Sequence, residues 1–173
     1  MIVEGRAIVY DSPTVLFEVE GRKYYEVIAQ GALDGADMRD VPFRYNHAQS
    51  VMIMARTRNK TLELIPDSKG LLIRARLANT TAGRDLYELI KRGDIDKMSF
   101  AFTVKEDKYD RETRTRTIIK FGRIADVSAV DTPAYNDTYL AARSYFEAQA
   151  EAERQAAEAA EARRRRLILM TYC

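Results

Sequence analysis

The stretch KMSFAFTVKEDKYDRETRTRTIIKFGRIADVSAV, residues 97–130, contains the pattern that decides the fold class. Apolar and β-branched side chains recur along residues 97–109 and again along residues 114–130. The Asp-Arg-Glu-Thr sequence at 110–113 lies between these two runs and is polar throughout. This pattern predicts two strands around a turn.

Strand patterns also precede this segment. Residues 14–28 predict two strands with a turn at Glu20 and Gly21, and residues 61–65 and 71–78 predict a hairpin. In that hairpin Pro66 fixes its own φ and Gly70 permits the exit from the turn. Two further runs with strand character are 7–10 and 51–58, whereas 31–40 predicts a short helix or a loop.

Residues 79–94 change to a helical period. Leu86, Leu89 and Ile90 recur at helical spacing, Thr80 or Thr81 suits the N-cap, and Gly93 stands where a C-cap glycine belongs. Many short strands with one clear helix predict an α+β fold. We expect a small, mostly antiparallel β-barrel, or a twisted sheet, with surrounding helices.

The end of the chain has a different composition. Residues 141–166 contain neither Gly nor Pro, and ten of these 26 residues are Ala, which predicts a helix. Alanine methyl groups bury little surface, so we expect this helix to project and to bind a partner. The sequence thus predicts a β-barrel domain at 1–140 and an Ala/Glu/Arg-rich helical tail at 141–173.

Composition limits the classes of function. The chain has 28 basic and 26 acidic residues, and the net charge of +2 gives no indication of nucleic-acid or membrane binding. Residues 163–166 are all Arg, which indicates a solvated helix end or a contact with nucleic acid or acidic scaffold. The start resembles no signal peptide, and no apolar run reaches the roughly 18 residues of a membrane helix.

Cysteine usage and short motifs exclude further classes. Cys173 is the only cysteine and the last residue, so an internal disulfide is impossible and a reducing compartment is expected. Cys173 is also a poor nucleophile candidate, because nothing at a chain end would hold a base against it. The sequence has no CxxC, HExxH, P-loop or GxGxxG motif, so we expect neither a metal nor a nucleotide cofactor.

Three residues are candidates for chemistry. Alternation places Ser99 beside Ala101 on one strand face, which leaves space for a substrate or simply faces solvent. Asp126 lies in an apolar strand and points the same way as Ser128, so it either pairs with an imidazole or serves as a strand-end cap or arginine partner. His47 is the only histidine. A serine, a base and an acid suffice for nucleophilic catalysis, but their order alone does not distinguish a site from coincidence.

Four segments together carry a resemblance to a known family. They are GALDG at 31–35, RYNHAQSVMIMARTRNKTLEL at 44–64, DSKGLLIRARLANTTAGRDLYELIKRGDIDKMSFAFTV at 67–104, and RIADVSAVDTPAYNDT at 123–138. In this order and with these gaps, residues 1 to about 143 resemble the prohead (procapsid maturation) proteases of tailed bacteriophages, which are serine peptidases.

The resemblance implies a fold and a set of roles. The fold would be similar to that of the herpesvirus maturation proteases, a compact β-barrel surrounded by helices. His47 matches the general base and Ser99 the nucleophile, while Asp126 stands where such sequences usually carry Glu in a Glu-Val-Ser triplet. Backbone N–H groups are the expected oxyanion donors, with Asn79–Gly83 as one candidate segment.

Three hypotheses of function follow. In the first, a serine endopeptidase inside the procapsid, in the host cytoplasm, cleaves scaffold or the scaffolding segment of the major capsid protein, and also itself. Related proteases are dimers or become active on association, so a homo-oligomer is expected. The second is a non-catalytic scaffolding or packaging protein that retains the protease fold, and the third is a small β-barrel binding module. Self-cleavage that is lost in Ser99→Ala would separate the first from the others.

Overall fold

The computed structural model describes residues 1–19, 21–131, 148–149, 151–152 and 154–163. The chain divides into two compact units, Met1–Tyr135 and Asn136–Cys173. In the second unit every described residue is helical, and nearly all are exposed. The described part of the chain contains no helix with both the length and the apolar character needed to cross a membrane.

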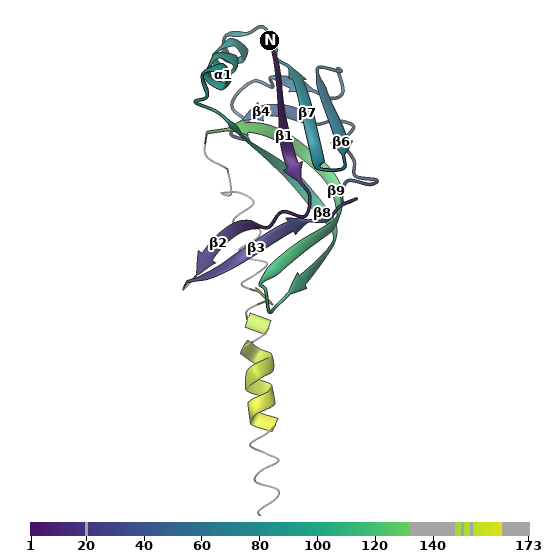
Figure 1. The fold of residues 1–173 in the computed structure, drawn as a ribbon, viewed down its shortest axis with the longest axis vertical. Coiled ribbons are helices and arrows are strands. Elements are labelled where there is room, and N and C mark those ends of the chain that lie inside the picture. Colours follow the sequence, from purple (N-terminus) through teal and green to yellow (C-terminus); the bar gives the residue numbers. More distant parts are fainter. Residues whose placement is uncertain (20, 132–147, 150, 153, 164–173) are drawn as a thin grey trace, which may run out of the picture. The chain divides into compact units, whose positions relative to one another are not determined.

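Strands dominate the first unit, and one helix interrupts them (Figure 1). The elements, in chain order, are β1 (Ile2–Val9), β2 (Thr14–Val19), β3 (Arg22–Ile28), β4 (Pro42–Tyr45), β5 (Ala55–Arg56), β6 (Leu62–Asp67), β7 (Gly70–Arg76), α1 (Thr81–Arg92), β8 (Lys97–Asp110) and β9 (Thr115–Val130).

The smaller sheet has the strand order β1-β7-β6, and both of its ladders are antiparallel. The predicted hairpin forms here, with Asp67 opposite Gly70 across the turn. Pro66 lies within β6 rather than in the turn, where an edge strand tolerates its missing N–H. Position 70 has no room for a side chain, because a Cβ atom on Gly70 would lie 1.9 Å from the carbonyl oxygen of Ile8.

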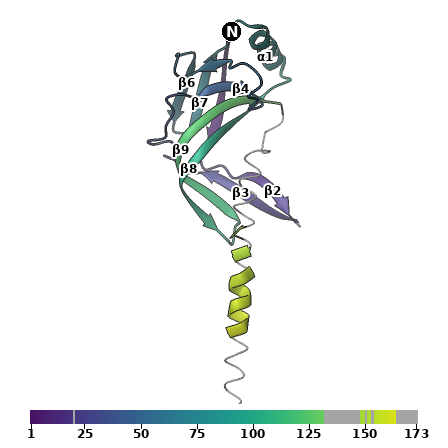
Figure 2. The same cartoon turned by 180° about the vertical axis from the view of Figure 1, so that it is seen from behind.

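The larger sheet is organised by β9. Its first residues pair in parallel with β3, its last residues pair in parallel with β4, and β8 pairs with it in antiparallel fashion along its other side. This is the hairpin predicted for residues 97–130, and because Asp110 pairs with Thr115, its turn comprises residues 111–114, one position later than the predicted turn. Four register shifts along the β8–β9 ladder accompany the pronounced curvature of the hairpin in Figures 1 and 2.

The α+β class is confirmed, but the expectation of a barrel is wrong. The described strands form two separate sheets, whose edge strands are β1 and β6 in one sheet and β2, β5 and β8 in the other. A barrel would require these edges to be joined by hydrogen bonds. The two sheets instead share one apolar core, to which β1 contributes Ile8, β7 contributes Ile73, and β9 contributes Ile124 and Val127.

Local signals correctly predicted the helix, whereas two other segments differ. Thr80 accepts the N–H of Gly83 as the N-cap of α1, and Gly93 ends the helix with a φ of 85°. Residues 31–35 form turns rather than a helix. The strand expected at 51–58 is reduced to the two residues of β5, because its partner β4 is short and a loop follows it.

Candidate active site

The candidate site is built on one face of the larger sheet, where three strands are in register. Arg44 of β4 lies opposite Ser128 of β9, and Ser128 lies opposite Ser99 of β8. Asp126 precedes Ser128 by two residues and is paired with Ala101, so it shares the face of Ser128. The sheet therefore places a serine and an acid from different strands on one surface.

The opposite face of the same strands is anchored in the core. Phe43, Val127 and Phe100 are in register across β4, β9 and β8, and the first two are almost fully buried. The ring of Phe100 stacks on that of Phe102 at 5.0 Å, and both rings meet the edge of Phe121. Slippage by one residue would exchange the two faces, so this packing fixes the orientation of Ser99.

His47 lies just beyond β4, in a tight turn. The N–H of Asn46 donates to the carbonyl of Ala129, which is the last bond of β4 to β9. Asn46 and His47 then adopt φ values of 49° and 56°, and the N–H of Ala48 donates to the carbonyl of Tyr45. Left-handed backbone at two such residues costs about 1–2 kcal/mol each, and strain of this kind is common at functional sites.

Side chains brace this turn from three directions. The guanidinium of Arg44 donates to the carbonyl of Ala48 at 3.1 Å, which ties the turn to the strand that precedes it. The N–H of Asp131 donates to the side-chain oxygen of Asn46 at 3.3 Å. The hydroxyl of Tyr45 donates to the carboxylate of Asp131, and this bond raises the pKa of the phenol.

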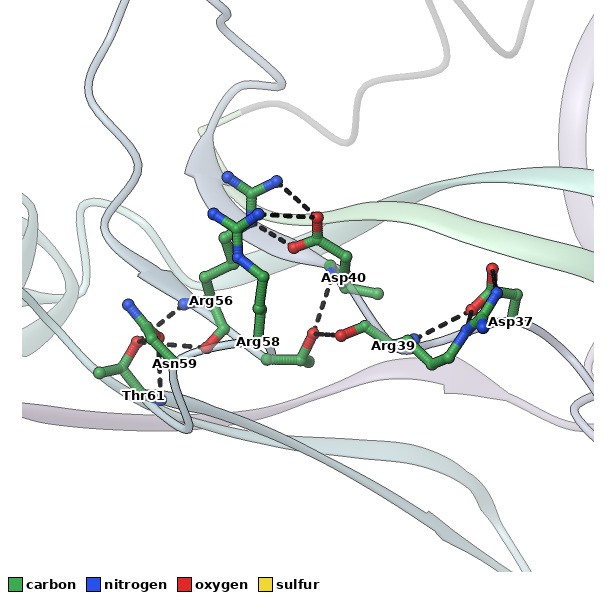
Figure 3. A network of polar contacts seen from close by, with 9 residues as sticks. Asp37, Arg39, Asp40, Arg56, Arg58, Asn59 and Thr61 are labelled. Carbon is green, nitrogen blue, oxygen red and sulfur yellow. Dashed lines mark hydrogen bonds and ion pairs between the residues drawn. The ribbon is translucent and has the colours of Figure 1, made fainter.

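An ionic network supports the segments on both sides of β4 (Figure 3). Asp40 faces the guanidinium groups of Arg56 and Arg58, and the bond from Arg56 lowers the pKa of this carboxyl group. Asp37 pairs with Arg39, which holds the pKa of Asp37 well below its usual range. Figure 3 shows these pairs along the chain that leads into β4 and along the turn after β5, so the network ties the entry of β4 to the end of its partner strand β5.

The three candidate side chains form one chain of hydrogen bonds. His47 Nδ1 lies 2.7 Å from Asp126 Oδ1, and His47 Nε2 lies 2.9 Å from Ser99 Oγ. When the carboxylate is ionised it can only accept, and a neutral imidazole in this contact then carries its proton on Nδ1 and leaves Nε2 to accept the hydroxyl proton of Ser99. The shorter side chain of Asp126, compared with Glu, therefore reaches the ring without difficulty.

These three side chains are partly shielded from solvent. The side chains of His47 and Asp126 are each only 15% exposed, so their bond is weakened little by solvent. Ser99 is half-buried, which leaves its hydroxyl accessible from one side. This arrangement can remove the proton of a serine hydroxyl and stabilise the imidazolium that results.

A second serine lies on the other side of the imidazole. Ser128 Oγ donates to Asp126 Oδ1 at 2.9 Å and lies 3.4 Å from His47 Nδ1. Ser128 is fully buried, whereas Ser99 faces Nε2 and is partly exposed. Of these two hydroxyl groups, a substrate carbonyl can approach only that of Ser99. The geometry therefore favours Ser99 over Ser128 as a nucleophile.

Sequence reasoning identified His47, Ser99 and Asp126, and the structure brings all three together. It noted that Ser128 shares the face of Asp126 but did not foresee the bond between them, and it missed Arg44. The αL turn could have been suspected from Asn46, since Asn tolerates positive φ. Within Asn79–Gly83, the segment suggested for oxyanion donors, the N–H groups of Thr80 and Gly83 already bond to Ala78 and Thr80, and the suggestion for the rest of the segment stays a prediction.

Comparisons with known proteins place the chain in a family. Comparison with curated proteins and with solved structures gives no match. The family model described as caudovirus prohead serine protease matches residues 1–152 of the 173. The matched range includes Ser99, His47 and Asp126. Since it spans most of the sequence, this chain belongs to the caudovirus prohead serine protease family, the serine peptidases of bacteriophage capsid maturation.

Proposed function

We propose that Ser99 is the nucleophile of this peptidase, His47 its general base, and Asp126 the acid that orients the base. The observation that carries this proposal is the unbroken path Ser99–His47–Asp126, with hydrogen bonds of 2.9 and 2.7 Å. Three residues from a strand, a turn and another strand meet at distances suited to proton transfer. Polar side chains that only faced solvent on a sheet would have no reason to form this continuous hydrogen-bonded path.

The reaction follows from these positions. Ser99 Oγ attacks the carbonyl carbon of the peptide bond while its proton passes to Nε2 of His47. Asp126 accepts the Nδ1 hydrogen bond throughout and stabilises the positive ring. His47 then gives the proton to the leaving amine, and the C–N bond breaks to leave an acyl group on Ser99. Water, deprotonated by the same ring, releases this acyl group and restores the hydroxyl.

The substrate in this proposal is a protein of the immature shell. The enzyme acts inside the procapsid, in the host cytoplasm, on scaffold or on the scaffolding segment of the major capsid protein. Membership of a prohead protease family supports this substrate class. Removal of internal protein makes room for DNA. We further propose that the enzyme cleaves its own chain and that association of copies sets the time of activation.

The helical tail would deliver the enzyme to its substrate. We propose that residues 1–140 carry catalysis, whereas 141–173 join a helical scaffold during assembly. The exposed Ala, Glu and Arg side chains of the described helical residues suit a helix that binds other helices. A chain that ends at residue 143 should hydrolyse peptides normally and enter procapsids poorly. Incorporation at wild-type levels would contradict this role of the tail.

The decisive experiment compares three chains by intact mass after expression. These are the wild-type protein, Ser99→Ala and the control Ser68→Ala, whose serine lies exposed in the β6–β7 turn. We expect cleavage products from the wild type and the control and an uncut Ser99→Ala chain. Each chain is then coexpressed with the major capsid protein and its scaffold, to test cleavage in trans.

Two results would reject the proposal. Cleavage at the same bonds in all three chains would mean that another protease makes the products. Uncut chains throughout, with no cleavage of the capsid proteins in trans, would favour the non-catalytic scaffolding or packaging role. A serine-reactive fluorophosphonate provides the residue assignment, since its adduct should be found on Ser99 and not on the buried Ser128.

A further inference from the structure

We propose that Ser128 is a positioning residue of the catalytic site, which holds the carboxylate of Asp126 so that His47 keeps its proton on Nδ1. This inference rests on the proposed function of Ser99, His47 and Asp126. It adds a residue that bonds the acid at 2.9 Å and lies 3.4 Å from His47 Nδ1, the ring nitrogen that does not exchange a proton with Ser99.

Geometry assigns the hydroxyl of Ser128 to one oxygen of the acid. Asp126 Oδ1 accepts from Ser128 Oγ at 2.9 Å and from His47 Nδ1 at 2.7 Å. Two donors that converge on one oxygen restrict rotation of the carboxylate about its Cβ–Cγ bond. The acid is thereby presented to Nδ1 through a single atom in a single orientation.

The backbone of β9 fixes both the donor, Ser128, and the acceptor, Asp126. Ser128 and Asp126 are alternate residues of β9, and Ser128 is held between β4 and β8 by ladders on both sides. Among the buried residues of the first unit, Ser128 and Glu26 are the polar ones. A buried hydroxyl is costly unless it is hydrogen-bonded, and here its bond goes to a charged group.

The consequence concerns the tautomer of the imidazole. If the carboxylate rotates away, Nδ1 loses its acceptor and the proton is free to occupy Nε2. A ring protonated at Nε2 cannot accept the proton of Ser99, so the rate of acylation falls while substrate binding is retained. Because Asp is shorter than Glu, its carboxyl group has little freedom to recover the contact.

The first test measures peptide hydrolysis by Ser128→Ala, which removes one oxygen and adds no volume. We expect kcat to fall by roughly 10- to 100-fold with KM within twofold of the wild-type value. Ser128→Thr keeps the hydroxyl and should recover most of the rate. The matched control is Ser50→Ala, which removes an exposed hydroxyl from the loop that follows His47 and should leave both constants unchanged.

The second test observes the ring directly and needs no activity. His47 is the only histidine, so its two ring nitrogens give the only imidazole signals in a long-range ¹H–¹⁵N spectrum of the labelled chain. We expect the Nδ1–H tautomer to predominate in the wild type and in Ser50→Ala. In Ser128→Ala the share of the Nε2–H tautomer should rise clearly.

The outcomes separate the two proposals. If the wild-type chain shows no peptide hydrolysis that Ser99→Ala abolishes, the proposed function is overturned. The spectrum would still show whether Ser128 sets the tautomer of His47. Ser128→Ala with wild-type kcat, or with an unchanged tautomer ratio, would overturn the positioning role. A slow Ser128→Ala enzyme with the normal tautomer would likewise reject it in favour of a packing effect.

Discussion

Glu26 offers a sharp test of the electrostatics of the fold, far along the sheet from the candidate site. It lies on β3 in register with Arg116 of β9, and only 8% of the residue is exposed. Arg116 Nη1 is 3.6 Å from Glu26 Oε2, but its Nε bonds Asp107 at 2.6 Å. Oε2 of Glu26 accepts no hydrogen bond from the described residues.

These surroundings disfavour the charged form of Glu26. Burial raises its pKa from 4.5 to about 7, the attraction of Arg116 opposes this rise, and the repulsion of Asp107 adds to it. The folded state thus holds its proton more tightly than the unfolded state does. Folding stability therefore falls as the pH rises from about 4.5 to about 7 and then stays low. Over this pH range the free energy of unfolding falls by about 3 kcal/mol in total.

Glu26→Gln should remove this loss, because the amide stays neutral. Relative to the parent chain, the variant should change from nearly equal stability at pH 4 to a gain of about 3 kcal/mol at pH 8. Urea unfolding at four pH values measures this, with Ser99→Ala in both chains to prevent self-cleavage. Glu106→Gln is the matched control, since its pair with Lys120 is exposed and worth at most about 1 kcal/mol. A gain that does not grow with pH would refute the reasoning.

Three further substitutions have defined outcomes. Asp126→Asn should lower kcat by about 10³–10⁴-fold with little change in KM, because the amide can donate to Nδ1 and favour the wrong tautomer; steady-state peptide hydrolysis checks this, and a loss below tenfold would speak against the role of the acid. Thr80→Ala should reduce the free energy of unfolding by about 1 kcal/mol, since the cap bond to Gly83 is lost; Thr80→Ser should retain stability, and equal urea midpoints for Ala and Ser would contradict the cap. Gly70→Ala should cost at least about 2 kcal/mol, because its Cβ would meet the carbonyl of Ile8; a wild-type thermal midpoint would disprove that close approach.

Short-range chemistry made several elements predictable. The ends of α1 follow from Thr80 and Gly93, because a cap bond and a left-handed C-terminal residue involve only neighbours along the chain. The β8–β9 hairpin follows from alternation on both sides of a polar turn. For the αL backbone at His47 the local sequence offered only the hint of Asn46, since the bonds of Arg44 and Asn46 that hold the turn involve side chains whose partners local pattern does not specify.

The sequence by itself determined the α+β class, the family and the identity of the three candidate side chains. It did so through local periodicity and through motifs, which depend on residue type and order. Only the tertiary structure decided that the sheets stay open, that Ser128 bonds Asp126, and that Ser99 is the serine facing Nε2. Those outcomes depend on the pairing and register of strands far apart in the chain, and His47 and Asp126 are separated by 79 positions. Such pairing is governed by packing of the whole core and not by any local stretch of residues.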